Sequence, residues 1–348
     1  MAKQSRTTIA DVARRAGVSK GSVSFALNDR PGLAPETRAR ILDAARDLGW
    51  TPSLRARALS VGKSFACGLV VGRSPDVIAA DPFFHSLIAG IEDEFATAGQ
   101  VLVLAVANPG RHESVTYRQL AEGKRVDGVI LSDLRAGDDR IALVRELGLA
   151  AVTLGLPDLE SPYSSVSVDD SAGVRLAVQH LAQLGHVRVA HVAGPEAMLH
   201  SRRRREAFER AAADAGIRAQ VVTTDFSARE GALATEALLS AELRPTAIVY
   251  SNDHMAVAGL GVAGRFGLTV PDDLSIVGFD DTELGRYVFP ALTSVATDAR
   301  EWGAVAARTL LAAVGGEPPI DIQLAEPSLS VRGSTGTTPT EPRGIRRT

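Results

Sequence analysis

Short helical patterns separated by turn residues fill the first fifty residues, and they constrain the fold of this part of the chain more than any other feature. From Thr8 onward, apolar residues recur at helical spacing, and Asp11 follows Thr8 by three positions, as in a capping box. Gly17 then supplies a permissive turn. Ser19 is placed to cap a second helix from about Lys20 to Asn28. The spacing predicts two helices joined by a tight turn.

The second of these helices has an inner and an outer face. Its inward residues are predicted to be Val23, Ala26 and Leu27, and its outward residues Lys20, Gly21, Ser22, Ser24 and Phe25. A third pattern runs from about Pro35 to Leu48 and begins with proline at the first helical position. Its predicted core stripe is Ile41, Leu42, Ala45 and Leu48. Three such helices predict a small core, with the outward set as a candidate recognition surface.

The motif TIADVARRAGVS, followed by VSFALN, resembles the head of the lactose repressor (LacI/GalR) family of bacterial transcription regulators, and the resemblance extends to about Gly333. It implies that the second helix enters the major groove of DNA, where Lys20, Gly21 and Phe25 read base edges. The other residues that we expect this surface to offer to DNA are Thr8, Ser19, Ser22, Ser24 and Asn28.

Two positions depart from the pattern of that family. Phe25 stands where the family usually has Arg, and phenylalanine can offer only apolar contact, for example with a thymine methyl, instead of a bidentate contact with guanine. Ala34 stands where a Ser or Thr normally caps the third helix, and loss of such a cap costs on the order of 1 kcal/mol. Pro35 and Glu36 partly offset this loss.

Charge separates the head from the rest of the chain. Residues 1–63 contain twelve Lys or Arg and five Asp or Glu, a net charge of +7, whereas the whole chain carries −3, which leaves −10 for the remaining residues. A basic head on an acidic body favours binding to DNA phosphates over a helical bundle that only docks proteins.

Residues 52–63 form a predicted hinge. The stretch SLRARALSV has helical spacing, but isolated helices shorter than roughly 12 residues are marginal in water. In the family, two such segments fold against each other on DNA, which implies that Leu59 enters the minor groove as an apolar wedge and that Arg55 and Arg57 contact phosphates or the groove. A plain flexible linker is the alternative.

A β/α alternation follows the hinge. Continuous apolar runs alternate with amphipathic segments of helical length, as expected for parallel sheets covered on both faces. These runs are residues 67–71, 101–106, 126–132, 150–154, 188–194, 219–224, 246–251 and 274–279. A body of roughly 280 residues is longer than one open sheet usually needs, which predicts two similar Rossmann-like lobes, the first at about 64–165 and the second from about 168 to 290.

Together with the family topology, this gives a small all-α helix-turn-helix head and an α/β body of two Rossmann-like parallel-sheet lobes, similar to periplasmic binding proteins. The expected domains are a DNA-binding head (1–51), a hinge (52–63), an effector-binding body (64–335) and a disordered tail (336–348). The chain is expected to cross between the lobes three times, with lobe 1 at about 64–165 and 292–320 and lobe 2 at about 166–291 and 321–335.

Ligand-binding candidates follow the predicted strands, because ligands bind at strand ends in open α/β sheets. By similarity to family motifs, Arg204 grips ligand oxygens, Phe226 stacks on the ligand and Asp253 holds ligand hydroxyls. The remaining candidates are Asp81, Phe83, Phe84, Ser132, Asp133 and Asp280. Asp253 could instead cap its own helix, and either Phe83 or Phe84 could belong to the core.

Two further departures bear on the ligand. Gly155 stands where many family members have Asp, and Met198 stands where purine-responsive members have an additional Arg. These departures disfavour a purine and leave a sugar, or a phosphorylated or otherwise polar metabolite, as the predicted ligand.

Other functions are disfavoured by the same sequence. GLGVAG at 259–264 spells a dinucleotide motif, but its glycines fall inside a predicted helix and do not directly follow a strand. No zinc-type spacing, nucleophile elbow or acid–base pair is evident, so we expect no catalytic residues, no metal and no cofactor. The single cysteine, Cys67, and the lack of an apolar signal or membrane span predict a cytoplasmic protein with no membrane partner.

Taken together, these features predict an allosteric repressor. A homodimer would bind a pseudo-palindromic operator in double-stranded DNA, and a small effector in the cleft would change that affinity. The rival is a soluble sugar-binding protein of transport type, which would share the two-lobed body but would need export and would lack residues 8–60. A sugar-metabolising enzyme is the weaker rival.

Overall fold

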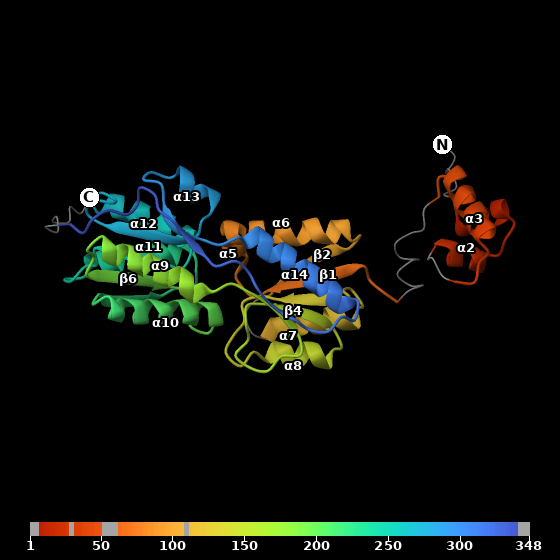
Figure 1. The fold of residues 1–348 in the computed structure, drawn as a ribbon, viewed down its shortest axis with the longest axis horizontal. Helices are drawn as coiled ribbons and strands as arrows, with labels where there is room; N and C mark the ends of the chain where they lie inside the picture. The colour runs from red at the N-terminus through yellow and green to blue at the C-terminus, as the bar shows by residue number, and fades with distance from the viewer. Residues whose placement is uncertain (1–6, 28–30, 51–61, 108–110, 340–348) are drawn as a thin grey trace. The chain divides into compact units, whose positions relative to one another are not determined.

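The computed structural model describes residues 7–27, 31–50, 62–107 and 111–339, and the chain divides into two compact units between Ser64 and Phe65 (Figure 1). Four of the residues expected to contact DNA lie outside the described residues: Asn28, Arg55, Arg57 and Leu59. The amino-terminal unit is called the head below, and the second unit the body.

The head contains helices α1 (Ile9–Ala16), α2 (Lys20–Leu27) and α3 (Pro35–Asp47). Its core consists of Val12, Ala13, Ala16, Val23, Ala26, Ile41, Ala44 and Ala45. The Thr8 backbone N–H and hydroxyl both donate to Asp11 Oδ2, at 2.9 and 2.7 Å, and the Ser22 backbone N–H donates to Ser19 Oγ at 3.1 Å. The capping residues that the sequence indicated therefore begin the first two helices.

One residue of the predicted α3 stripe is wrong. Leu42 is exposed, and Ala44 takes its place beside Ile41 and Ala45, because positions i, i+3 and i+4 share a helical face whereas i and i+1 do not. Arg40, on the outer side of α3, caps the end of α1, because its Nε donates to the Ala16 carbonyl.

The described residues of the body form two sheets of six strands each. In the first lobe the order is β11-β5-β4-β3-β1-β2, and all pairs are parallel. The strands are β1 (Ala66–Val71), β2 (Val101–Val106), β3 (Gly128–Leu131), β4 (Ala150–Leu154), β5 (Ser164–Ser167) and β11 (Asp321–Gln323). Helices α6 (Pro82–Thr97) and α14 (Ala299–Val314) cover one face, and α7 (Arg111–Glu122) and α8 (Asp139–Glu146) the other (Figure 1). The short helix α5 (Pro75–Ala80) precedes α6.

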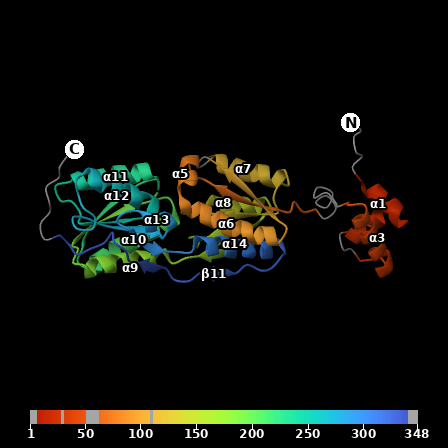
Figure 2. The same cartoon turned by 90° about the horizontal axis from the view of Figure 1, so that it is seen from above.

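The second lobe repeats this plan with the order β12-β10-β9-β8-β6-β7, in which only β12 is antiparallel. The strands are β6 (Arg188–Ala193), β7 (Arg218–Thr223), β8 (Ala247–Tyr250), β9 (Ser275–Asp280), β10 (Thr293–Ala296) and β12 (Ser328–Ser330). Helices α11 (Ala228–Ser240) and α12 (Asp253–Arg265) cover one face, and α9 (Asp170–Gln183) and α10 (Leu199–Asp214) the other (Figure 2). Helix α13 (Glu283–Tyr287) follows β9.

The three crossings fall a few residues later than expected. The strand β5 still belongs to the first sheet, β10 to the second and β11 to the first, so the chain crosses after Ser167, after Ala296 and after Gln323. These strands are short and polar, and the apolar periodicity did not reveal them.

The start of the expected disordered tail is also different in the structure. Residues 336–339 are described, and they pack on the second lobe: the Gly336 carbonyl accepts from His186 Nε2 at 3.0 Å, and the Thr338 N–H donates to the Leu184 carbonyl at 2.9 Å. These bonds hold a polar segment that composition alone assigns to a tail.

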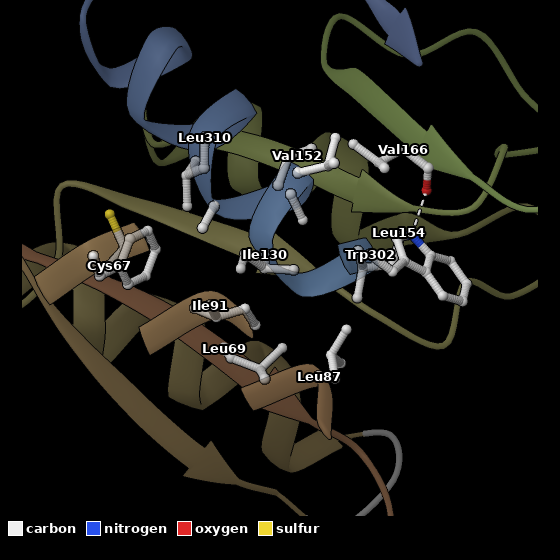
Figure 3. Packing of buried hydrophobic residues seen from close by; sticks show 14 of the residues in the cluster. Cys67, Leu69, Leu87, Ile91, Ile130, Val152, Leu154, Val166, Trp302 and Leu310 are labelled. Atoms are coloured by element: carbon white, nitrogen blue, oxygen red, sulfur yellow. Dashed lines mark hydrogen bonds between the residues drawn. The ribbon is translucent and has the colours of Figure 1, made fainter. Parts of the chain in front are cut away.

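The core of the first lobe lies between α6, α14 and the sheet (Figure 3). The Trp302 indole donates to the Val166 carbonyl at 2.8 Å, and this bond ties α14 to β5. Gly90 and Gly303 lie where α6 and α14 approach most closely, and a Cβ at either would overlap the backbone of the other helix. None of the described helices combines the length and the apolar sequence that a membrane-spanning segment requires.

Candidate functional site

A cavity of about 60 Å³ is lined by residues of both lobes, at the carboxyl ends of their parallel strands. Eight of the nine ligand candidates line it: Asp81, Phe83, Phe84, Ser132, Asp133, Arg204, Phe226 and Asp280. The strands therefore bring together side chains that are up to 199 positions apart in the chain, from Asp81 to Asp280. We call this space the interlobe cavity.

Arg73 and Asp133 form a buried ion pair in the first lobe. The guanidinium donates to both carboxylate oxygens, at 2.7 and 2.5 Å. Burial by itself would raise the pKa of Asp133, but Arg73 outweighs it and lowers the pKa to about 2. At the cavity wall, the positive charge of Arg73 is therefore neutralised by Asp133 and is not free to bind an anion.

Arg204 is paired in a similar way in the second lobe. Its Nε and Nη2 donate to Asp170 Oδ1 at 2.8 and 2.7 Å, and its Nη1 donates to the Ser251 carbonyl at 2.7 Å. The guanidinium also lies 3.6 Å from the centroid of the Phe279 ring. These contacts fix the orientation of Arg204 at the cavity wall.

Aromatic rings supply the apolar part of the lining. Phe226 is stacked on His200, with ring centroids 5.6 Å apart and planes 15° from parallel, and the Arg73 guanidinium lies 4.5 Å from the Phe226 centroid. Burial lowers the pKa of His200 to about 4, so its imidazole is neutral near pH 7. Phe83 and Phe84 meet edge to face, but Phe84 is fully buried whereas Phe83 is half-buried.

The remaining polar groups at the cavity include the carboxylates of Asp81 and Asp280 and the amide of Asn252. Asp81 caps α6 through the Phe83 N–H, at 3.1 Å, and its other oxygen accepts from Asn252 Nδ2 of the second lobe at 3.3 Å. Asp280 is half-buried at the cavity wall, and desolvation raises its pKa well above the usual value. Within the described residues, we find no hydrogen bond to its carboxylate. Asp280 is thus the acceptor most available to a ligand.

Asp253 does not line the cavity, which corrects its expected position. Its Oδ2 accepts from the Thr282 N–H at 2.7 Å and its Oδ1 from Ser294 Oγ at 2.5 Å, while burial raises its pKa to about 6. It does not cap its own helix either, because Asn252 Oδ1 accepts from the Met255 N–H at 2.9 Å. The carboxylate points to the turn after β9, and the preceding residue, Asn252, reaches the cavity.

Left-handed backbone conformations are concentrated at this site. Of the six described non-glycine residues with positive φ, Asp133 (51°), Phe226 (72°) and Asp280 (104°) line the cavity, and Asp281 (51°) follows directly. Such conformations are costly for residues with a side chain, and they are found at ligand sites.

Sequence reasoning missed several lining residues. Arg73, Asp170, His200, Asn252 and Trp302 all line the cavity. Asn252 could have been found, because it stands beside Asp253 in the same motif, between a strand and a helix. For the others the local sequence carries no distinguishing signal; Trp302, for instance, fits the apolar stripe of its helix.

The candidate DNA surface lies on α2 of the head. Lys20, Gly21 and Phe25 are exposed, and Phe25 is 42% exposed although it is apolar. Ser22 and Ser24 are half-buried, and Ser22 Oγ lies 3.0 Å from Ser19 Oγ, so these serines are less accessible than the outward pattern predicts. Thr8 and Ser19 are exposed at the starts of their helices.

GLGVAG does not adopt a phosphate-binding geometry. The strand β8 ends at Tyr250, and α12 runs from Asp253 to Arg265 through all three glycines. Gly259 contacts the buried Tyr250, where a Cβ would overlap the phenol. Among the residues that the structure describes, no group of three or more His, Cys, Asp or Glu is placed to hold a metal ion.

Both the head and the body match known protein families. The sequence pattern of the bacterial regulatory proteins of the lacI family matches residues 8–53, and that of a periplasmic binding protein-like domain matches residues 178–335. The HTH-type transcriptional regulator MalR of Streptomyces coelicolor is 33% identical to this chain over an alignment 350 residues long. The alignment covers 96% of this chain and 98% of MalR.

Two solved structures extend this similarity to the fold. The transcriptional regulator CelR in complex with cellobiose has a TM-score of 0.73 at 31% identity and covers 94% of this chain and 100% of its own. The lac repressor dimer bound to operator and the anti-inducer ONPF has a TM-score of 0.81 at 28% identity, with coverages of 95% and 99%.

Proposed function

This chain belongs to the lacI family of bacterial regulatory proteins, and on that premise we propose that it is a repressor whose operator affinity is set by an uncharged sugar in the interlobe cavity. As a member of the family it is a DNA-binding transcriptional regulator controlled by a ligand, and not an enzyme.

The observation that carries the sugar assignment is the composition of the cavity wall. Asp81 and Asp280 offer carboxylate oxygens to ligand hydroxyls, and the half-buried Phe83 ring offers apolar surface of the kind that packs on a pyranose. CelR was solved with cellobiose, which is a neutral sugar.

The ion pairs favour an uncharged sugar over a phosphorylated one. Arg73 and Arg204 each already bind a buried carboxylate, Asp133 and Asp170 respectively. A ligand phosphate that bound either of these two arginines would have to displace its carboxylate and leave it buried and unpaired, which is costly. Hydroxyls require no such exchange.

The size of the cavity supports regulation by lobe movement. Ligand pockets usually measure roughly 300–1,000 Å³, so a cavity of about 60 Å³ must widen to admit a sugar. Contacts between the lobes, such as Arg203 Nη2 to the Leu156 carbonyl at 2.7 Å and the Leu199 N–H to the Leu134 carbonyl at 2.8 Å, would break or re-form as it does. A sugar that binds one arrangement better shifts the population toward it.

In the proposed mechanism, a homodimer presents two heads to a pseudo-palindromic operator. Lys20, Gly21 and Phe25 of each head read base edges, and Arg55, Arg57 and Leu59 contact the centre of the site. Lobe movement changes the match between the two heads and the operator.

A selection from random duplex oligonucleotides by the full-length chain tests this function. We expect an enriched inverted repeat, and we expect cellobiose, maltose, ribose or galactose to change its affinity in a gel-shift titration. A chain that binds one of these sugars but selects no DNA sequence would be a soluble sugar-binding protein, and the proposal would be rejected.

A further inference from the structure

The buried carboxylate of Asp253 lies beneath the turn that carries Asp280 to the interlobe cavity. Asp253 is 1% exposed, and its Oδ2 accepts from both the backbone N–H and the hydroxyl of Thr282, at 2.7 and 2.9 Å. Gly278, two residues before Asp280, makes room for this approach, because a Cβ there would overlap Asp253 Oδ1. The Asp253 carboxylate, which belongs to the first residue of α12, therefore binds the turn through Thr282.

The backbone of this turn requires support. Asp280 and Asp281 are consecutive residues with φ of 104° and 51°, in the region that favours glycine. Such residues keep their conformation only where the surroundings hold them. The bonds from Thr282 to Asp253 hold one end, and the Asp281 N–H, which donates to Ser294 Oγ at 3.1 Å, holds the middle.

The same contacts reach two of the three crossings between the lobes. Ser294 lies in β10, after which the chain crosses to α14 of the first lobe, and Ser294 Oγ donates to Asp253 Oδ1 at 2.5 Å. The Asp281 carboxylate binds the other crossing: it accepts from Ser330 Oγ of β12 at 3.1 Å and forms an ion pair with Arg332 at 2.5 Å. The strand β12 is the first element of the second lobe after the chain returns from β11.

We propose that Asp253 is a positioning residue: it holds Asp280 in place for the ligand and, with Ser294, Asp281 and Arg332, connects the turn at the cavity to the strands through which the chain crosses between the lobes. These four residues are called the crossover clamp. The proposal rests on the function proposed above, because it takes the interlobe cavity as the effector site.

The clamp gives the site a physical route for regulation. A ligand that bonds to Asp280 changes the forces on a turn whose conformation is already strained, and the clamp connects that turn to β10 and β12. β10 leads directly into α14 of the first lobe, and β12 directly follows β11 of the first lobe. A small displacement of Asp280 is thus transmitted to β10 and β12, the segments about which the lobes must rotate.

Hydrogen exchange of the full-length chain tests the clamp without any ligand. Ser294→Ala removes one bond to Asp253 and one to Asp281, and Asp253→Asn replaces an acceptor oxygen with an amide. We expect the amides of residues 280–285, 293–297 and 329–333 to exchange faster by about tenfold in both variants. The matched control is Asp273→Asn, which changes a buried carboxylate of the same lobe whose Oδ2 accepts from the Thr269 N–H, away from the clamp.

Faster exchange spread evenly over the second lobe, including β6 and β7, would mean that Asp253 only stabilises the lobe, and it would overturn the proposal. Unchanged exchange at 280–285 would also overturn it. Neither outcome depends on which ligand the cavity takes.

Calorimetric titration with cellobiose then tests the link to Asp280. We expect Ser294→Ala to weaken cellobiose binding by about threefold to thirtyfold, Asp280→Asn to weaken it more, and the double variant to equal Asp280→Asn, since Ser294 acts through Asp280. Additive losses would contradict the positioning role. If cellobiose and the other sugars fail to bind the unmodified chain, the sugar assignment is lost, while the exchange experiment still decides whether the clamp exists.

Discussion

The Arg73 guanidinium binds both oxygens of Asp133 within the first lobe and lies 4.5 Å from the ring centroid of Phe226 in the second lobe. One cation thus neutralises a buried carboxylate and contacts an aromatic ring across the interlobe cavity. The pair belongs to the wall of the site as well as to the stability of the lobe, and both roles can be measured.

Arg73→Met should lower the free energy of unfolding of the body by about 3–5 kcal/mol, because it leaves Asp133 buried without a partner. Arg73→Met combined with Asp133→Leu should recover most of this loss, since no unpaired charge remains. Urea denaturation of each variant gives the values. Arg205→Met, which breaks two ion pairs near the surface, with Glu196 and Glu209, is the control and should cost no more than about 1 kcal/mol.

His191 predicts a pH dependence of stability. Burial lowers its pKa in the folded chain to about 4, from a usual value of about 6.5. The unfolded chain then binds a proton that the folded chain does not, so stability is complete above about pH 6.5 and falls toward pH 4, by about 3 kcal/mol in total. In His191→Gln, the difference in unfolding free energy between pH 7.5 and 4.5 should be smaller by about 2–3 kcal/mol. Identical pH profiles would contradict this assignment.

Gly303→Ala should destabilise the first lobe, because its methyl group would overlap the Leu87 carbonyl at the contact of α14 with α6. Overpacking of this kind costs typically about 1–3 kcal/mol. Gly261→Ala, in the exposed middle of α12 with open space around it, is the matched control and should raise stability by up to about 1 kcal/mol. Thermal unfolding measures both variants, and equal effects would show that the helix contact tolerates a side chain.

Ala34→Ser should stabilise the head. Ala34 occupies the N-cap position of α3 with extended backbone and no side-chain hydrogen bond, so a serine there can accept a free N–H and add about 1 kcal/mol. Ala39→Ser, on the exposed side of the same helix, should give no gain, because serine in a helix interior is less favourable than alanine. The fluorescence of Trp50, which packs against the head core, follows unfolding of the head.

Phe25→Arg should change which operator the chain selects. The exposed ring offers only apolar contact, whereas arginine can bind guanine O6 and N7, a preference worth about 1–3 kcal/mol. Repeating the oligonucleotide selection with this variant should enrich guanine at the position that Phe25 contacts in each half-site. The exposed Ala39→Ser variant should select the original sequence, and an unchanged preference in Phe25→Arg would mean that Phe25 reads no base.

Much of the architecture was predictable from local patterns. The apolar runs at 67–71 and 274–279 each coincide with a buried strand, because a strand covered on both faces must be apolar along its length. The short strands β5 and β10, with the sequences SSVS and TSVA, escaped notice since polar residues interrupt them. The lobe boundaries depend on these strands, and for that reason the predicted crossings were displaced.

The sequence alone determined the helices of the head and the two-lobed α/β body, because capping residues, periodicity and strand ends are local features of the chain, and the family resemblance added eight of the residues that line the cavity. Only the tertiary structure decided that Arg73 pairs with Asp133, that His200 stacks on Phe226, and that Asp253 faces Thr282 and Ser294 while Asn252 reaches the cavity. These partners come from separate strands and helices, and which of them meet is set by the order of strands in each sheet and by the points where the chain crosses between lobes. No local spacing records that order.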